Sequence, residues 1–142
     1  MAFDPASDYP LGERRPDLVS TPSGLPLDEV TLEALREHRL DWEDLRATPE
    51  TLRRQSEVAL AAGRPALAEN LARAAELAML PGETILAAYT ALRPHRSTED
   101  ELAAWALRLE ESGAPLTAAL VREAASVYAE RELLRAGERA AV

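Results

Sequence analysis

Residues 97–116 read STEDELAAWALRLEESGAPL, and this stretch contains the start of one helix, its end and the start of the next. Thr98 followed by Glu101 has the spacing of a capping box, and Ser97 with Asp100 is a less ideal alternative for the same role. Four apolar side chains then recur at helical spacing, namely Leu102, Trp105, Ala106 and Leu109. The stretch therefore predicts a capped amphipathic helix that buries these side chains.

A second helix is predicted to begin directly after this one. Gly113 favours the end of the first helix, because glycine readily adopts the left-handed conformation found there, and Pro115 favours the first position of the second. This last helix is expected to continue to about residue 136. Its buried face is expected to consist of Leu116, Leu120, Ala124, Val127 and Leu134. The same helix also carries Val121, Ala125 and Tyr128, which widen its apolar surface beyond this one face. Such additional apolar surface on a small domain is typical of a subunit interface.

Proline and glycine mark two earlier helices in the same way. Thr48 is a suitable N-cap for a helix that begins at Pro49 and ends at Gly63. The next helix begins at Pro65 and ends before the dipeptide Pro81-Gly82. Its apolar side chains at helical spacing are Leu67, Leu71, Ala74 and Ala78.

Three shorter helical segments are predicted around these. One spans about residues 83–92, before Pro94, with one face made of Ile85, Tyr89 and Leu92. Another runs from an Asp28 cap to Glu37, with Leu32 and Leu35 facing inward. Residues 41–45 add one more turn.

The first twenty-six residues differ from the rest in their proline content. Half of the chain's 10 prolines lie there, at positions 5, 10, 16, 22 and 26. Because each proline fixes φ and removes an amide donor, regular structure is not expected in this segment. We therefore predict an all-α protein, with an extended proline-rich arm over residues 1–26 and a helical domain over residues 27–142. The domain is expected to be a small bundle of about five longer helices.

Composition limits the function classes. The formal net charge of −9 disfavours nucleic acid and anionic membranes as partners, because both would repel the chain. The absence of cysteine excludes disulfides and thiolate metal sites and favours a reducing compartment. No stretch has the length and apolar character needed to cross a bilayer. We therefore expect a soluble cytoplasmic protein.

No residue pattern predicts an active site. His38 and His95 are the only histidines, and they lack the spacing of a zinc or di-iron site. The acidic cluster Asp41, Glu43 and Asp44 lacks the glycine and the final glutamate of a calcium loop. The glycines are dispersed and form no phosphate-binding loop. We therefore predict no catalytic, cofactor-binding or metal-binding residue in this chain.

Several short segments recur together in one protein family. They are Ser7–Leu11 (SDYPL), Thr48–Arg53 (TPETLR), Ala91–Pro94 (ALRP), Arg96–Thr98 (RST) and Val121–Ala125 (VREAA). In content, order and spacing these segments resemble the small subunit of adenosylcobalamin-dependent diol and glycerol dehydratases. The resemblance extends over about residues 7–134.

The resemblance implies an assembly and a reaction. Dehydratases of this family contain large, medium and small subunits, usually two copies of each, and convert a 1,2-diol or glycerol to an aldehyde and water by a radical mechanism. The corrin lies between the large and medium subunits, so adenosylcobalamin is expected on the complex and not on this chain. The small subunit supplies no catalytic side chain in this family. Its implied role is to hold the large subunit, with the N-terminal arm lying across that partner.

Interface candidates follow from the motifs and from aromatic and apolar positions: Tyr9, Leu11, Trp42, Arg93, Arg96, Arg122 and Tyr128. The arginines are suited to bidentate pairing with carboxylates of the large subunit. An intrachain role is the alternative: Arg93 would complement the carbonyl end of a helix, and Arg122 would pair with Glu123 or Glu130.

Two departures from the family pattern bear on these expectations. His95 stands where relatives commonly have an aromatic residue after the Arg-Pro pair, which weakens the case for an aromatic contact there. Only six residues precede Ser7, whereas members that enter bacterial microcompartments carry a longer N-terminal extension. We therefore expect a freely cytosolic complex, or one targeted through another subunit. The competing function is that of a stand-alone acidic helical adaptor.

Overall fold

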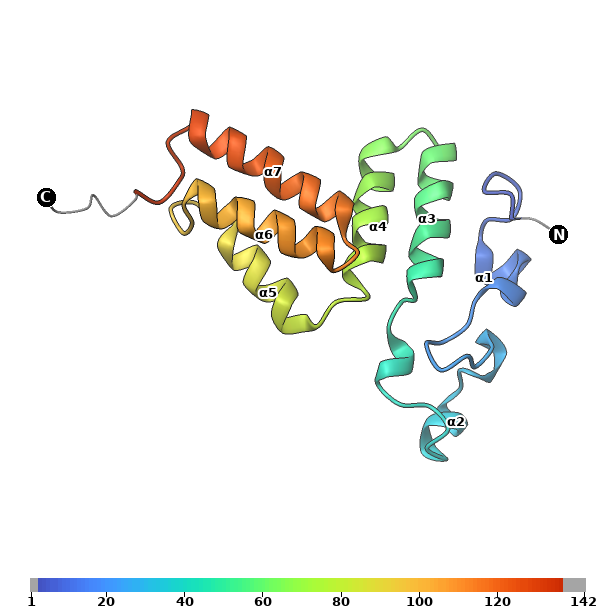
Figure 1. Cartoon of the computed structure of the whole chain (residues 1–142). Helices are drawn as coiled ribbons and strands as arrows, with labels where there is room; N and C mark the ends of the chain where they lie inside the picture. Colours follow the sequence, from blue (N-terminus) through green and yellow to red (C-terminus); the bar gives the residue numbers. More distant parts are fainter. Residues whose placement is uncertain (1–2, 137–142) are drawn as a thin grey trace, which may run out of the picture. The chain divides into compact units, whose positions relative to one another are not determined.

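The computed structural model describes residues 3–136 and shows an all-α protein (Figure 1). Within these residues there are seven α-helices, three short 3₁₀ helices and no strand. The predicted fold class, a small helical bundle, is confirmed. The chain divides into two compact units, one up to Ala78 and one from Met79 onward. The predicted division into an arm, 1–26, and a helical domain, 27–142, stays a prediction.

The first unit is built on α3 (Pro49–Ala61) and α4 (Pro65–Leu77), which pack against each other. The helix starts and stops are those predicted from the sequence. Thr48 Oγ1 accepts a hydrogen bond from the Thr51 amide at 3.2 Å, and Gly63 ends α3 with a φ of 70°. The inward face of α4 differs from the prediction by one position, because Ala68 and Ala75 are buried instead. Small side chains at these positions allow the two helices to lie close together.

Five short elements precede α3 in the first unit. They are α1 (Leu11–Arg14), η1 (Pro16–Leu18), η2 (Leu27–Glu29), α2 (Leu32–Arg36) and η3 (Glu43–Leu45). The expectation of no regular structure in the proline-rich segment was therefore wrong for α1 and η1. The reason is that Pro10 and Pro16 lie at the starts of these turns. An amide proton at the start of a helix has no hydrogen-bond acceptor within the helix, so proline, which lacks this proton, is tolerated there.

The proline-rich segment is fastened to the rest of the first unit. Leu11 is only 3 % exposed. The Arg54 guanidinium donates a hydrogen bond to the Leu18 carbonyl oxygen at 2.5 Å, and the Ser23 amide donates to the Asp44 carboxylate at 3.1 Å. These bonds join positions that are far apart in the sequence, so the segment follows a defined course.

Helix α2 is shorter than predicted and faces a different way. Its N-cap is Thr31, whose side chain accepts a hydrogen bond from the Ala34 amide at 3.1 Å, and not Asp28. Ala34 is fully buried, whereas Leu32 and Leu35, expected to face inward, are exposed. A helix of one turn that starts three residues later turns a different side toward the core.

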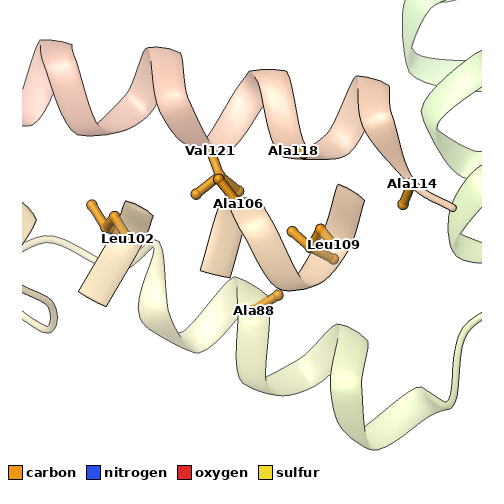
Figure 2. Packing of buried hydrophobic residues seen from close by; sticks show 7 residues of the cluster. All are labelled: Ala88, Leu102, Ala106, Leu109, Ala114, Ala118 and Val121. Carbon is orange, nitrogen blue, oxygen red and sulfur yellow. The ribbon is translucent and has the colours of Figure 1, made fainter. Parts of the chain in front are cut away.

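The second unit contains α5 (Gly82–Ala91), α6 (Glu99–Glu111) and α7 (Pro115–Glu130). The predicted capping box at Thr98 and Glu101 is present, and both of its hydrogen bonds form. The core consists of Ala88, Leu102, Ala106, Leu109, Ala114, Ala118 and Val121. Figure 2 shows these side chains between α7 and α5, with α6 in the middle.

The buried face of α7 is not the one predicted. Leu116, expected in the core, is 49 % exposed, whereas Ala118 and Val121 are fully buried. Ala125 and Tyr128, interpreted from the sequence as surplus apolar surface, pack against the same core. Alanine and valine on this face let α6 and α7 approach closely. The helix also ends at Glu130, earlier than the predicted residue 136.

The C-terminal return, residues 131–136, folds back onto the segment between α5 and α6. The His95 amide donates to the Leu133 carbonyl oxygen at 2.7 Å, and the Arg135 amide donates to the Ser97 carbonyl oxygen at 2.8 Å. The Arg135 guanidinium also pairs with the Glu101 carboxylate at 2.5 Å. The return therefore fixes the loop that leads into the capping box.

Glu101 is expected to make the stability of the second unit depend on pH. The Arg135 guanidinium, and after it the Thr98 amide, hold the pKa of the Glu101 carboxyl below its ordinary value of 4.5. The folded state thus favours the charged form, so this contribution is fully present above pH 4.5 and is lost as the pH falls through the lowered value. Below pH 4.5, the thermal unfolding midpoint of Glu101→Gln should fall less steeply than that of the natural chain. An equally shallow fall in the control Glu99→Gln would contradict this.

Candidate interaction surface

The histidine and acidic side chains of the described residues are dispersed. Within residues 3–136, no three side chains among His, Asp and Glu lie so that they could hold a metal ion. His38 and His95 are both exposed and lie in turns with left-handed φ values of 56° and 59°. Over the same residues, no helix has both the length and the apolar character needed to span a membrane. The functional surface is therefore best sought among exposed apolar and arginine side chains.

Exposed apolar side chains are frequent in the first unit. Trp42, just before η3, is 63 % exposed, and the Arg46 guanidinium lies over its ring at 4.3 Å from the centroid. Nearby in the chain, three leucines also face solvent: Leu32, Leu35 and Leu45. Tyr9 is half-exposed. Large apolar side chains exposed together are typical of a surface that another protein covers.

The second unit has its own exposed apolar face on α5. Leu86 is 70 % exposed and Tyr89 is 52 % exposed, whereas Ala88 on the opposite side is buried in the core. A groove of about 510 Å³ runs past Leu86 and Ala87 on this helix and reaches Arg96 and Ser97 in the loop after it. Of the predicted face made of Ile85, Tyr89 and Leu92, Leu92 packs against the core and Tyr89 is exposed. Ala88 takes the inner position and belongs to the core of this unit.

Comparison with known proteins gives this surface a context. A family model for the dehydratase small subunit matches residues 5–135 of the chain. The chain belongs to the dehydratase small subunit family. The propanediol dehydratase small subunit of Citrobacter freundii is 49 % identical over 130 residues, which cover 91 % of this chain and 76 % of the relative. That of Salmonella typhimurium strain LT2 is 48 % identical over 130 residues, which cover 91 % of this chain and 75 % of the relative.

Membership of this family settles the class of partner. A dehydratase small subunit is one component of a complex, and the resemblance inferred from the short motifs is confirmed. Larger subunits are therefore its partners. The stand-alone adaptor, which needs no such partner, is not favoured.

Three of the predicted interface residues of this small subunit have contacts within the chain. Leu11 is buried in the first unit. The Tyr128 hydroxyl donates to the Leu92 carbonyl oxygen at 2.6 Å and so provides a hydrogen bond for a carbonyl group at the C-terminal end of α5. Arg122 on α7 pairs with Glu110 on α6. Arg122 therefore forms an ion pair within the chain, but its partner is Glu110 and not the predicted Glu123 or Glu130.

The other four predicted interface residues are accessible in the dehydratase small subunit. Tyr9 and Trp42 are exposed in the first unit, and Arg93 and Arg96 are exposed in the second. The candidates are thus distributed over both units, and their role at an interface stays a prediction. Sequence reasoning missed Leu86. The signal for it was that α5, GETILAAYTA, has only one charged residue and hence no polar side.

Proposed function

We propose that this chain is the small, non-catalytic subunit of an adenosylcobalamin-dependent diol dehydratase and that it stabilises the large catalytic subunit. The observation that carries the proposal is the 49 % identity, over 91 % of the chain, to a protein named propanediol dehydratase small subunit. The complex would convert a 1,2-diol or glycerol to an aldehyde and water. Its choice between propane-1,2-diol and glycerol would be set by another subunit.

Three grooves formed by residues 3–136 do not fit adenosylcobalamin. A corrin needs a broad enclosed pocket, whereas the grooves of the two units are open and measure about 510, 320 and 210 Å³. Arginine and glutamate line the first two of these grooves, and no histidine suited to binding cobalt lines any of the three. We therefore assign the cofactor to the partner subunits and derive no reaction step on this chain.

The proposed assembly contains two copies each of the large, medium and small subunits and works in the cytoplasm. Support for a role in assembly comes from the exposed side chains of Trp42 and Leu86, which a partner would cover. Because this chain has a net charge of −9, the partner surface that binds it is expected to carry basic groups. Carboxylates of the partner are expected only opposite the exposed arginines of this chain.

Co-expression tests the proposal directly. The chain is produced with the large and medium subunits of a diol dehydratase, and the complex is purified through a tag on the large subunit. We expect the small subunit to co-elute and the complex to form aldehyde from propane-1,2-diol when adenosylcobalamin is added. The small subunit alone should form none. The proposal fails if the untagged small subunit never co-elutes, or if it produces aldehyde without its partners.

The N-terminal segment is expected to contribute to assembly. Deleting residues 1–26 removes Tyr9 and the turns fastened by Arg54, so retention on the tagged large subunit should fall by about tenfold or more. A matched deletion of residues 1–6 keeps Tyr9 and should leave retention unchanged. Circular dichroism checks that the helix content of both variants stays close to that of the natural chain. Full retention of the longer deletion, with unchanged activity, would exclude this segment as a clamp.

A further inference from the structure

Helix α5 is apolar on two opposite sides, although only one of them is covered in this chain. The inner side contributes Ala88 to the core of the second unit. The outer side presents Leu86 and Tyr89 to solvent, and Glu83 is the only charged residue among the ten of this helix. A helix that is apolar all round is typical of one buried on both sides. The outer side of α5 therefore has the character of a surface that is covered in the assembled protein.

The outer side of α5 also has a receptive shape. The groove of about 510 Å³, here called the α5 groove, is lined by Glu83, Leu86, Ala87, Thr90, Ala91, Arg96 and Ser97. The Ser97 hydroxyl donates to the Ala91 carbonyl oxygen at 2.9 Å, and the Thr90 hydroxyl donates to the Leu86 carbonyl oxygen at 2.7 Å. These polar groups are thus satisfied within the chain. What remains for a ligand in the groove is mainly apolar contact.

Arg96 supplies positive charge in the lining of the groove, and Arg93 lies three residues before it in the chain. Arg93 and Arg96 are exposed, and within residues 3–136 their guanidinium groups form no hydrogen bond or ion pair. By contrast, Arg122 and Arg135 in the same unit are paired with glutamates. In a chain of net charge −9, the unpaired Arg96 in a mainly apolar groove forms a local site for a carboxylate.

The backbone that carries these arginines is held in place. The Arg96 amide donates to the Arg93 carbonyl oxygen at 3.2 Å, and the Arg96 carbonyl oxygen accepts from the Arg135 guanidinium at 3.2 Å. The neighbouring His95 amide is bonded to Leu133 in the C-terminal return. The Arg96 side chain therefore extends from a fixed turn, which lowers the entropy lost when it binds a partner.

We propose that the α5 groove binds an apolar segment of the large dehydratase subunit that carries an aspartate or glutamate. Its apolar side chains contact Leu86 and Ala87, and its carboxylate pairs with Arg96. A second copy of this chain is a poorer occupant, because two chains of charge −9 repel each other. The inference rests on the proposed function, and it adds a second docking point in the second unit to the one predicted around Trp42.

Matched variants test the α5 groove in the full complex of large, medium and small subunits. Leu86→Ser and Arg96→Glu change the groove, whereas Leu107→Ser on α6 and Arg131→Glu after α7 change exposed residues of the same types outside it. All four positions are exposed, so thermal unfolding midpoints should remain close to that of the natural chain. Each groove variant should weaken retention on the tagged large subunit by about tenfold or more, and the controls should leave it unchanged.

Photo-crosslinking identifies the occupant. The amino acid benzoylphenylalanine replaces Leu86, and illumination of the complex should link the small subunit to an acidic, apolar peptide of the large subunit. A link to the medium subunit or to a second small subunit would overturn the assignment, as would full retention of both groove variants. If the natural small subunit does not bind the large subunit at all, the proposed function itself fails. The two failures are therefore distinguishable.

Discussion

Replacing Leu109 by alanine is expected to lower the free energy of unfolding of the second unit by about 2–5 kcal/mol. Leu109 is fully buried, and it is one of only three large side chains in this core beside Leu102 and Val121. Its neighbours there are mainly alanines, which cannot extend into the cavity that the substitution leaves. The loss is therefore expected to lie toward the upper end of this range.

Two tryptophans make this measurement specific for one unit. Trp105 belongs to α6 in the second unit, and Trp42 belongs to the first unit. In a variant that also carries Trp42→Phe, Trp105 is the remaining tryptophan, so its fluorescence during urea unfolding reports the second unit alone. Leu107→Ala is the matched control, because Leu107 lies on the same helix and is 55 % exposed. We expect the control to change stability by less than about 0.5 kcal/mol. Equal losses in both variants would contradict the assignment of this core.

Replacing Trp42 by alanine is expected to act on assembly and hardly on folding. A tryptophan at the centre of an interface commonly contributes 2 kcal/mol or more, so the affinity for the large subunit should fall by about 30-fold or more. Within the described residues, the substitution removes the contact of Trp42 with Arg46, and such an exposed cation–π contact stabilises by about 0.5–1 kcal/mol. The affinity and the unfolding free energy should therefore respond very differently.

Binding of purified small subunit to the immobilised complex of large and medium subunits measures this effect. Leu60→Ala is the control, because Leu60 on α3 is exposed to a similar degree and is not among the predicted interface residues. It should bind as the natural chain does. Undiminished affinity of Trp42→Ala would place Trp42 outside the interface, whereas a large drop in its stability would show a structural role.

Helix starts and stops were predictable because their signals are local. Thr48 with Pro49 starts α3, Thr98 with Glu101 starts α6, and Gly113 ends α6 with a φ of 83°. Each signal depends on hydrogen bonds or backbone angles within a few residues. The same local logic explains the error near the N-terminus. Proline at the first position of a turn is compatible with a helix, although a count of prolines argues against one.

The faces of the helices were less predictable because they depend on neighbours. Helix α7 carries two apolar stripes, and only the approach of α6 determines that Ala118 and Val121 face the core. Likewise, Arg122 pairs with Glu110 on α6, and the Tyr128 hydroxyl reaches the Leu92 carbonyl oxygen. Such contacts join distant parts of the chain, so spacing within one helix does not reveal them.

The family could be identified from the sequence because its motifs are short strings in a fixed order, and the match over residues 5–135 confirms it. The contact residues could not be identified with the same success. Which exposed side chains a partner covers depends on the partner's surface, and that surface belongs to another polypeptide. Leu86 illustrates this, because its exposure became informative only when Ala88 was known to occupy the inner side of α5.

The alanine-rich core of the second unit has a consequence for how the subunits are kept in proportion. Alanine buries little area, so each such position adds little to the hydrophobic free energy of the free subunit. Binding to a partner adds to stability by mass action. We therefore expect surplus copies that find no partner to unfold more often than bound copies and to be degraded by cellular proteases. Abundance of the small subunit would then follow that of the large one without any dedicated regulator.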